Sequence, residues 1–124
     1  MIQTIEIRPN PNGQKDKKRF IATFTMGDGK IKTTKFGLWK PPQDWNTTTF
    51  YDGATPEKRK AYIARHSGMS EDWTKDGITT AGYLSRWVLW EFSDINNIKK
   101  KLRKDSGVRK IVLDLTPKYK GKKT

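Results

Sequence analysis

One histidine, His66, is the first candidate for acid–base chemistry in this chain, because an imidazole titrates near neutral pH. A catalytic or zinc-binding histidine needs partners, and the sequence contains neither a second histidine nor a cysteine. Its place near the end of a predicted helix favours a capping or surface role. We therefore predict that His66 is not a catalytic residue.

Aspartates are the next candidates, because several of them together can hold a magnesium ion, as in a nuclease. Here they stand singly in turn-like stretches, where aspartate is a common turn former: Asp44, Asp52, Asp72 and Asp76. The only acidic pair is Glu71-Asp72, which we expect to begin a local turn or to pair with Lys58 or Arg59. The sequence thus predicts no metal and no cofactor, and a small nuclease remains an alternative.

A short glycine-rich stretch, Gly27-Asp28-Gly29-Lys30, has the composition of a phosphate-binding loop. It lacks the full glycine spacing of such loops, and it lies between two predicted strands rather than before a helix. We interpret it as a hairpin turn. Without a catalytic pattern, the chain is predicted to be a binding or assembly protein and not an enzyme.

Positive charge is the dominant feature of the sequence. The 124 residues include 26 Lys and Arg but only 13 Asp and Glu, which gives a net charge of +13. The excess lies in residues 1–40 and 99–124, whereas residues 41–98 carry more acidic than basic side chains. Such a field attracts nucleic acid, anionic lipid or acidic protein surfaces, although a basic surface can also serve solubility alone.

Three basic clusters are the candidate sites for a polyanion or a protein partner. They contain Lys15, Lys17, Lys18 and Arg19, then Lys99, Lys100, Lys101, Arg103 and Lys104, and last Lys118, Tyr119, Lys120, Lys122 and Lys123. Lysine outnumbers arginine, which favours general electrostatic attraction over bidentate reading of bases. Any nucleic-acid binding is therefore expected to be independent of base sequence.

Aromatic residues gather in the near-neutral middle of the chain, which holds four of the five tryptophans. The densest stretch runs from Arg86 to Trp90. It either packs into the core with a cation–π or ion-pair contact from Arg86, or it forms a docking surface, since tryptophan and arginine dominate interface hot spots. The docking or core candidates are Trp73, Arg86, Trp87 and Trp90.

Strand patterns occur at both ends of the predicted domain. Residues 2–7 predict a short strand, residues 20–26 and 30–37 predict a β-hairpin, and residues 108–115 predict a last strand. Lysines on both faces of residues 30–37 are typical of an edge strand. Residues 15–19 are expected to form a charged loop, and the aromatic loop over residues 38–53 is expected to pack onto the body.

Helix signals fill the middle of the chain. Thr55 and Pro56 are suited to the N-cap and first position of a helix that ends near His66. A second helix is predicted from residues 79 or 80 to 92, and a third from an N-cap at Ser93 to Lys104, with Gly107 as the residue that ends it. In the second, Leu84, Trp87 and Val88 share one face and Trp90 lies away from it; in the third, Ile95, Ile98 and Leu102 form an apolar stripe.

The sequence therefore predicts an α+β fold: a small antiparallel sheet with an N-terminal β-hairpin, about three short helices and a C-terminal strand. Residues 1–116 form one domain, and residues 117–124 form a basic tail that needs a partner to become ordered. We expect no transmembrane segment and no signal peptide, because no apolar run is long enough and the first residues lack a basic segment followed by an apolar one.

A further pattern lies in residues 58–66, 71–73 and 79–90, together with the hairpin end Lys35-Phe36-Gly37. In these segments the chain resembles a family of short, basic, uncharacterised proteins of large nucleocytoplasmic DNA viruses of algae and amoebae. The resemblance as a whole extends over roughly half to two-thirds of the sequence, and these segments carry it. No activity or catalytic residue is implied by this resemblance.

The resemblance implies a viral setting, in which small basic proteins commonly serve in the particle. We expect a virion structural protein, such as a minor capsid or cement protein, that contacts capsid proteins or other virion proteins. The alternative is a packaging protein that binds nucleic acid without sequence preference, and contact with an inner-membrane surface also stays open. The expected location is the virion, with the host cytoplasm or virus factory during assembly.

Overall fold

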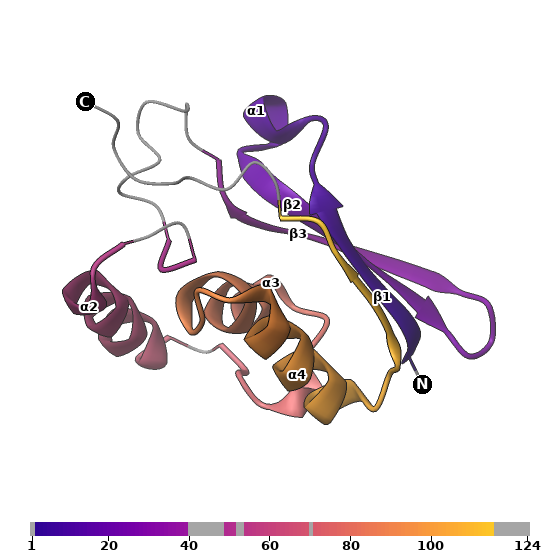
Figure 1. Cartoon of the computed structure of the whole chain (residues 1–124). Coiled ribbons are helices and arrows are strands. Elements are labelled where there is room, and N and C mark those ends of the chain that lie inside the picture. Colours follow the sequence, from indigo (N-terminus) through magenta and orange to yellow (C-terminus); the bar gives the residue numbers. More distant parts are fainter. Residues whose placement is uncertain (1, 40–48, 52–53, 70, 116–124) are drawn as a thin grey trace.

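The computed structural model describes residues 2–39, 49–51, 54–69 and 71–115. A four-stranded sheet has α2, α3 and α4 on one of its sides (Figure 1). The predicted α+β class, the hairpin, the three predicted helical segments and the C-terminal strand are confirmed. The predicted tail lies outside the described residues.

The strands are β1 (Ile2–Pro9), β2 (Lys18–Met26), β3 (Ile31–Leu38) and β4 (Lys110–Leu113), in the order β3-β2-β1-β4. The first three pair antiparallel, as predicted, but β4 pairs parallel with β1, so the sheet is mixed. A parallel pair needs a long crossover, and the helical segments between β3 and β4 supply it.

The hairpin has the predicted turn and the predicted edge strand. The Met26 N–H donates to the Lys30 carbonyl at 2.8 Å, and Gly29 takes a φ of +87° that glycine adopts without strain. Strand β3 is an edge strand of the sheet, which confirms the prediction drawn from its lysines.

The prediction that residues 15–19 form a charged loop is partly wrong. Helix α1 (Gly13–Asp16) occupies part of it, Lys17 ends the helix at a φ of +61°, and β2 has already begun by Lys18. The side chain of Asn10 closes this turn by donating to the Lys18 carbonyl at 3.0 Å and accepting from the Asn12 N–H at 3.0 Å. Such asparagine hydrogen bonds fix turns locally.

Helix α2 (Pro56–Ser67) begins as predicted, with the Thr55 hydroxyl accepting from the Lys58 N–H at 3.2 Å. Helix α4 (Ile95–Ser106) ends as predicted at Gly107, but its N-cap is Asp94 and not Ser93. The Asp94 carboxylate accepts from the Asn96 N–H at 2.9 Å, and a carboxylate also suits the positive end of the helix.

The second predicted helix consists of two geometries, α3 (Ala81–Leu84) and the π-helix η3 (Ser85–Trp90). The wider turn of η3 changes which side chains face the sheet. Leu89 is buried beside Leu84 and Val88, whereas Trp87 is only partly buried. The predicted face assumed 3.6 residues per turn, which a π-helix does not keep.

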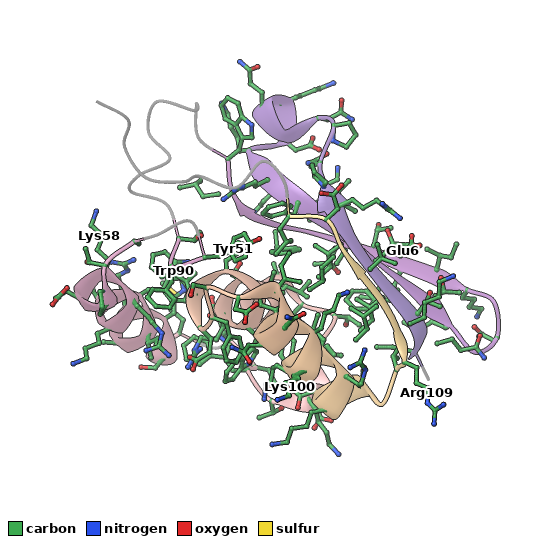
Figure 2. All side chains as sticks on the ribbon, viewed as in Figure 1. Glu6, Tyr51, Lys58, Trp90, Lys100 and Arg109 are labelled. Atoms are coloured by element: carbon green, nitrogen blue, oxygen red, sulfur yellow. The ribbon has the colours of Figure 1, made fainter. Side chains whose placement is uncertain are left out.

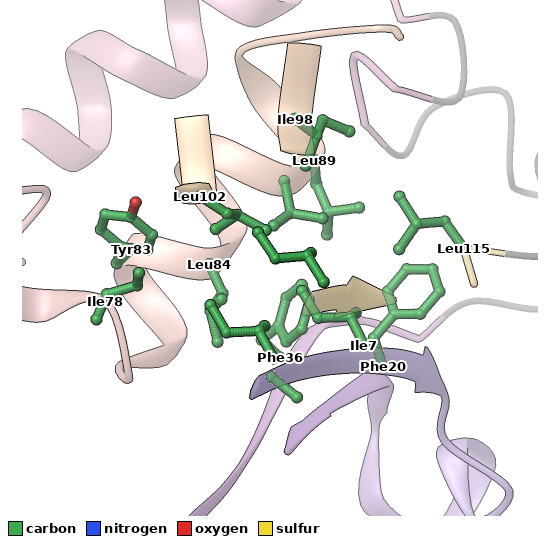
Figure 3. Packing of buried hydrophobic residues seen from close by; sticks show 14 of the residues in the cluster. Ile7, Phe20, Phe36, Ile78, Tyr83, Leu84, Leu89, Ile98, Leu102 and Leu115 are labelled. Carbon is green, nitrogen blue, oxygen red and sulfur yellow. The ribbon is translucent and has the colours of Figure 1, made fainter. Parts of the chain in front are cut away.

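The core lies between the sheet and the helical layer (Figure 3). Ile7, Phe20 and Phe36 meet Leu89 and Leu102 there, and all five are buried. Tyr51 is also buried, which confirms that this end of the aromatic loop packs onto the body; Trp45 lies outside the described residues.

A tight contact at Gly77 in the short helix η2 (Lys75–Gly77) yields a stability prediction. A Cβ at this position would lie 2.1 Å from the Asp72 carbonyl oxygen. We expect Gly77→Ala to destabilise the fold by about 1–3 kcal/mol, because backbone must move to admit the methyl group. Chemical denaturation measures the change.

Gly68→Ala is the matched control. Its nearest heavy atom would be the Arg65 carbonyl oxygen at 3.8 Å, an ordinary contact. The free energy of unfolding of this variant should lie within about 0.5 kcal/mol of that of the native chain. Equal stability of the two variants would contradict the tight contact.

Candidate docking and anion-binding surfaces

Arg86 lies between two of the predicted aromatic residues. Its guanidinium carbon is 5.0 Å from the ring centre of Trp73 and 4.2 Å from that of Trp87. The Trp87 indole N–H donates to the Trp73 carbonyl at 2.9 Å, and the Lys101 ammonium lies 4.1 Å from the Trp87 ring. Because the Arg86 side chain is only 11% exposed, these cation–π contacts are shielded from water and strengthened.

Glu91 balances the charge of this cluster. Its carboxylate accepts from the guanidinium groups of Arg59 on α2 and Arg86 on η3. Sequence reasoning missed Glu91, since a spacing of five residues brings two side chains together in a π-helix and not in an α-helix. Trp73, Arg86 and Trp87 thus hold the helical layer together through contacts within the chain.

Trp90 belongs to a different cluster. Its ring stacks on Tyr62 of α2 with the ring centres 4.4 Å apart, and Tyr62 stacks on His66 at 4.1 Å. Trp90 lies on the side of η3 that faces α2 (Figure 2). Burial first, and then the nearby Glu71 carboxylate, raise the pKa of Tyr62 to about 12.

The predicted roles of His66 and of the acidic pair are partly revised. His66 is half-buried, and its Nδ1 lies 3.1 Å from a Glu71 oxygen whose carboxylate also accepts from the Trp73 indole at 2.9 Å. Asp72 does form the expected turn, accepting from the Thr74 N–H at 2.9 Å. Glu71 does not form the alternative ion pair with Lys58 or Arg59, since its carboxylate contacts His66 and Trp73 and Arg59 pairs with Glu91.

This second cluster borders a cavity of about 620 Å³ between α2, η3 and the end of β3. Its wall combines the stacked rings of Tyr62 and Trp90 with Leu38 and Leu89. Three cationic side chains also line it: Lys18, Lys58 and Arg65. No pattern in the sequence indicates this cavity, because α2 and β3 meet only in the folded chain.

Helix α4 separates its basic residues by role. Lys101 pairs with Asp105 at 3.1 Å and lies over Trp87, and Lys99 is half-buried. The remaining three are exposed and form no ion pair with any described residue: Lys100, Arg103 and Lys104. Lys100 points away from the body (Figure 2). These three, which we call the α4 basic face, leave their charge available to a partner.

The N-terminal cluster is smaller than the sequence indicated. Lys15, Lys17 and Lys18 are exposed, but Arg19 is only 8% exposed and its guanidinium carbon lies 4.8 Å from the Phe20 ring centre. Arg19 therefore belongs to the folded body. The third cluster, from Lys118 to Lys123, falls outside the described residues.

Across residues 2–39, 49–51, 54–69 and 71–115, no three His, Cys, Asp or Glu side chains are grouped so that they could hold a metal ion. In the same part of the chain, no helix has both the length and the apolar character required to cross a membrane. Comparison with protein-family models, with curated proteins and with solved structures found no match for this sequence or fold.

The Arg86 stack predicts that lysine cannot replace arginine there. Arg86→Lys keeps the charge but loses the planar group that contacts two rings while it donates to Glu91. We expect a loss of about 1–3 kcal/mol in unfolding free energy. Arg103→Lys, on the α4 basic face, is the control, and its free energy of unfolding should lie within about 0.5 kcal/mol of that of the native chain. Equal losses would contradict a structural role for the stack.

The raised pKa of Tyr62 predicts an alkaline loss of stability. In the unfolded chain the phenol ionises near its ordinary pKa of 10.0, whereas the folded chain holds this proton up to about 12. Between these values the unfolded state releases a proton that the folded state retains, so stability falls as pH rises. Tyr62→Phe should show a shallower fall in denaturation experiments from about pH 9 to about pH 11. Parallel curves for the two proteins would contradict this.

Proposed function

We propose that this chain is a small basic structural protein of a large virus particle, such as a minor capsid or cement protein. It binds neighbouring proteins and anionic surfaces, and it acts by binding and not by catalysis. The observation that carries the proposal is the division of α4 into a core stripe and a basic face that forms no ion pair with the described residues.

The inner side of α4 supports this assignment because it fixes the helix firmly. Ile98 and Leu102 are fully buried against the rest of the core. The outer side then presents Lys100, Arg103 and Lys104 on a rigid support. Because the backbone of α4 is already fixed, only the side chains lose freedom when these charges meet an anionic partner, which favours binding.

The viral setting rests on the sequence resemblance of residues 58–66, 71–73 and 79–90. Under this proposal the partners are capsid proteins or other virion proteins, and an inner-membrane surface is a further anionic candidate. The protein would reside in the virion and pass through the host cytoplasm or virus factory during assembly.

The role of His66 also favours binding over catalysis. Its ring stacks on Tyr62, and its Nδ1 faces Glu71, whose other oxygen accepts from Trp73. These contacts join α2 to the segment before η2. They give the histidine a structural task that needs no substrate.

The alternative function is packaging of nucleic acid without sequence preference. It is favoured by the same α4 basic face, since exposed lysines suit phosphate contact. The two functions differ in the partner of that face, which is an acidic protein surface in the first and a phosphate backbone in the second.

Neutralising the α4 basic face tests the proposal. We expect the triple variant Lys100→Gln, Arg103→Gln and Lys104→Gln to enter virus particles several-fold less than the native chain, because it is attracted less strongly to its neighbours. Quantitative mass spectrometry of purified particles, relative to the major capsid protein, measures this. The control is the triple variant Lys58→Gln, Lys60→Gln and Arg65→Gln, which removes the same number of positive charges from α2.

Duplex binding then separates the two functions. Under the packaging alternative, the α4 triple variant lowers the salt dependence of binding to unrelated duplexes by about 0.9 in log–log slope for each phosphate that is no longer neutralised. That result, together with unchanged particle incorporation, would replace the structural assignment. Absence of the protein from purified particles would overturn the virion assignment altogether.

A further inference from the structure

Strand β3 has one edge that pairs with no other described strand. It is the last strand in the order β3-β2-β1-β4, and it spans Ile31–Leu38. At the opposite edge, β4 has only four residues, and all of them pair with β1. Among the described strands, the long free edge of the sheet is therefore β3, where N–H and C=O groups can accept a further strand.

The hairpin turn determines which backbone groups point outward. Because Met26 bonds to Lys30, the backbone groups of Lys32, Thr34 and Phe36 face β2 in the alternating antiparallel ladder. Those of Ile31, Thr33 and Lys35 then face away from it. These outward groups are the donors and acceptors that a fifth strand would use.

The strand that carries the free edge is bonded to the helical layer, and apolar side chains stand at both of its ends. The Thr34 hydroxyl donates to the Thr79 carbonyl at 2.6 Å, which ties β3 to the helical layer. Of the three large hydrophobic side chains that are exposed in the described residues, two are Ile31 (64%) and Leu38 (63%), the first and last residues of β3. A neighbouring strand would cover such side chains by cross-strand packing.

Charge indicates the kind of strand that fits. Lys30, Lys32 and Lys35 lie along the strand, and no acidic residue occurs from Gly29 to Leu38. Lys35 pairs with Asp16 at 2.9 Å, whereas Lys30 and Lys32 are exposed and form no ion pair with a described residue. A second copy paired at this edge would bring these lysines together, which is unfavourable. An acidic strand would neutralise them.

We propose that β3 binds an extended, acidic segment of a partner protein as a fifth strand of the sheet. The segment would make main-chain hydrogen bonds to Ile31, Thr33 and Lys35 and would place acidic side chains near Lys30 and Lys32. This site is separate from the α4 basic face and does not depend on the proposed viral function.

A labelled ten-residue peptide of alternating glutamate and valine is the probe, and fluorescence anisotropy with the full chain measures its binding. An otherwise identical peptide with lysine in place of glutamate should bind at least about tenfold more weakly, because it is repelled by the edge. Residue-resolved amide exchange should show new protection at Ile31, Thr33 and Lys35 when the acidic peptide is bound.

Thr33→Pro is the decisive variant. Proline removes the outward N–H but no bond to β2, and an edge strand tolerates it at such a position. Peptide affinity should fall by about tenfold, the effect of losing roughly one hydrogen bond. Lys32→Glu leaves the backbone intact and should weaken binding of the acidic peptide and strengthen binding of the lysine peptide. This variant tests the proposal if the proline variant does not fold.

The α4 triple variant serves as the control and should keep its peptide affinity within about twofold, since it leaves β3 intact. Failure of the native chain to bind the acidic peptide, or binding without protection on β3, would overturn the proposal. So would loss of affinity in the α4 variant alone, or dimerisation of the free chain through the β3 edge. None of these outcomes bears on particle incorporation, which tests the proposed function separately.

Discussion

The helical layer of this protein depends on one partly buried charge interaction, in which Glu91 accepts from both Arg59 and Arg86. Basic residues outnumber acidic ones by two to one, so a helix that packs its arginines inward must find them a counter-charge or a ring. Arg86 has both, because it lies between Trp73 and Trp87. With this charge balanced, η3 can lie against the sheet and α2 can lie against η3.

The same arrangement decides which charges remain for function. Basic side chains with partners inside the chain hold the body together, as Arg59, Arg86 and Lys101 do. Exposed basic side chains that form no ion pair with the described residues lie on α4 and β3, and others lie on α2 and at the turn before β2. A strongly basic chain can therefore have a well-packed interior and still present its excess charge outward, where it attracts anionic surfaces over a distance of about 10 Å at moderate salt.

The two proposed surfaces use different physics. The α4 basic face acts through side-chain charge on a rigid helix, so its binding depends on salt and little on the shape of the partner. The edge of β3 acts through main-chain hydrogen bonds, so it selects an extended segment, and its lysines select the sign of that segment's charge. The proposed structural role would gain from this combination, because charge brings a neighbour close and strand pairing then fixes its orientation.

Sequence alone determined the features whose signals are local. The two strand patterns around the Gly27-Asp28-Gly29-Lys30 turn defined the hairpin, and Thr55 and Pro56 defined the start of α2. Gly107 defined the end of α4. Each of these signals acts within a few residues of itself. Only the tertiary structure decided the parallel pairing of β4, the approach of Glu91 to Arg86 through a π-helical turn, and the stack of Trp90 on Tyr62. The Arg86–Glu91 contact and the Trp90 stack depend on how η3 packs, and the pairing of β4 depends on the path of the crossover. None of the three leaves a periodic trace in the sequence.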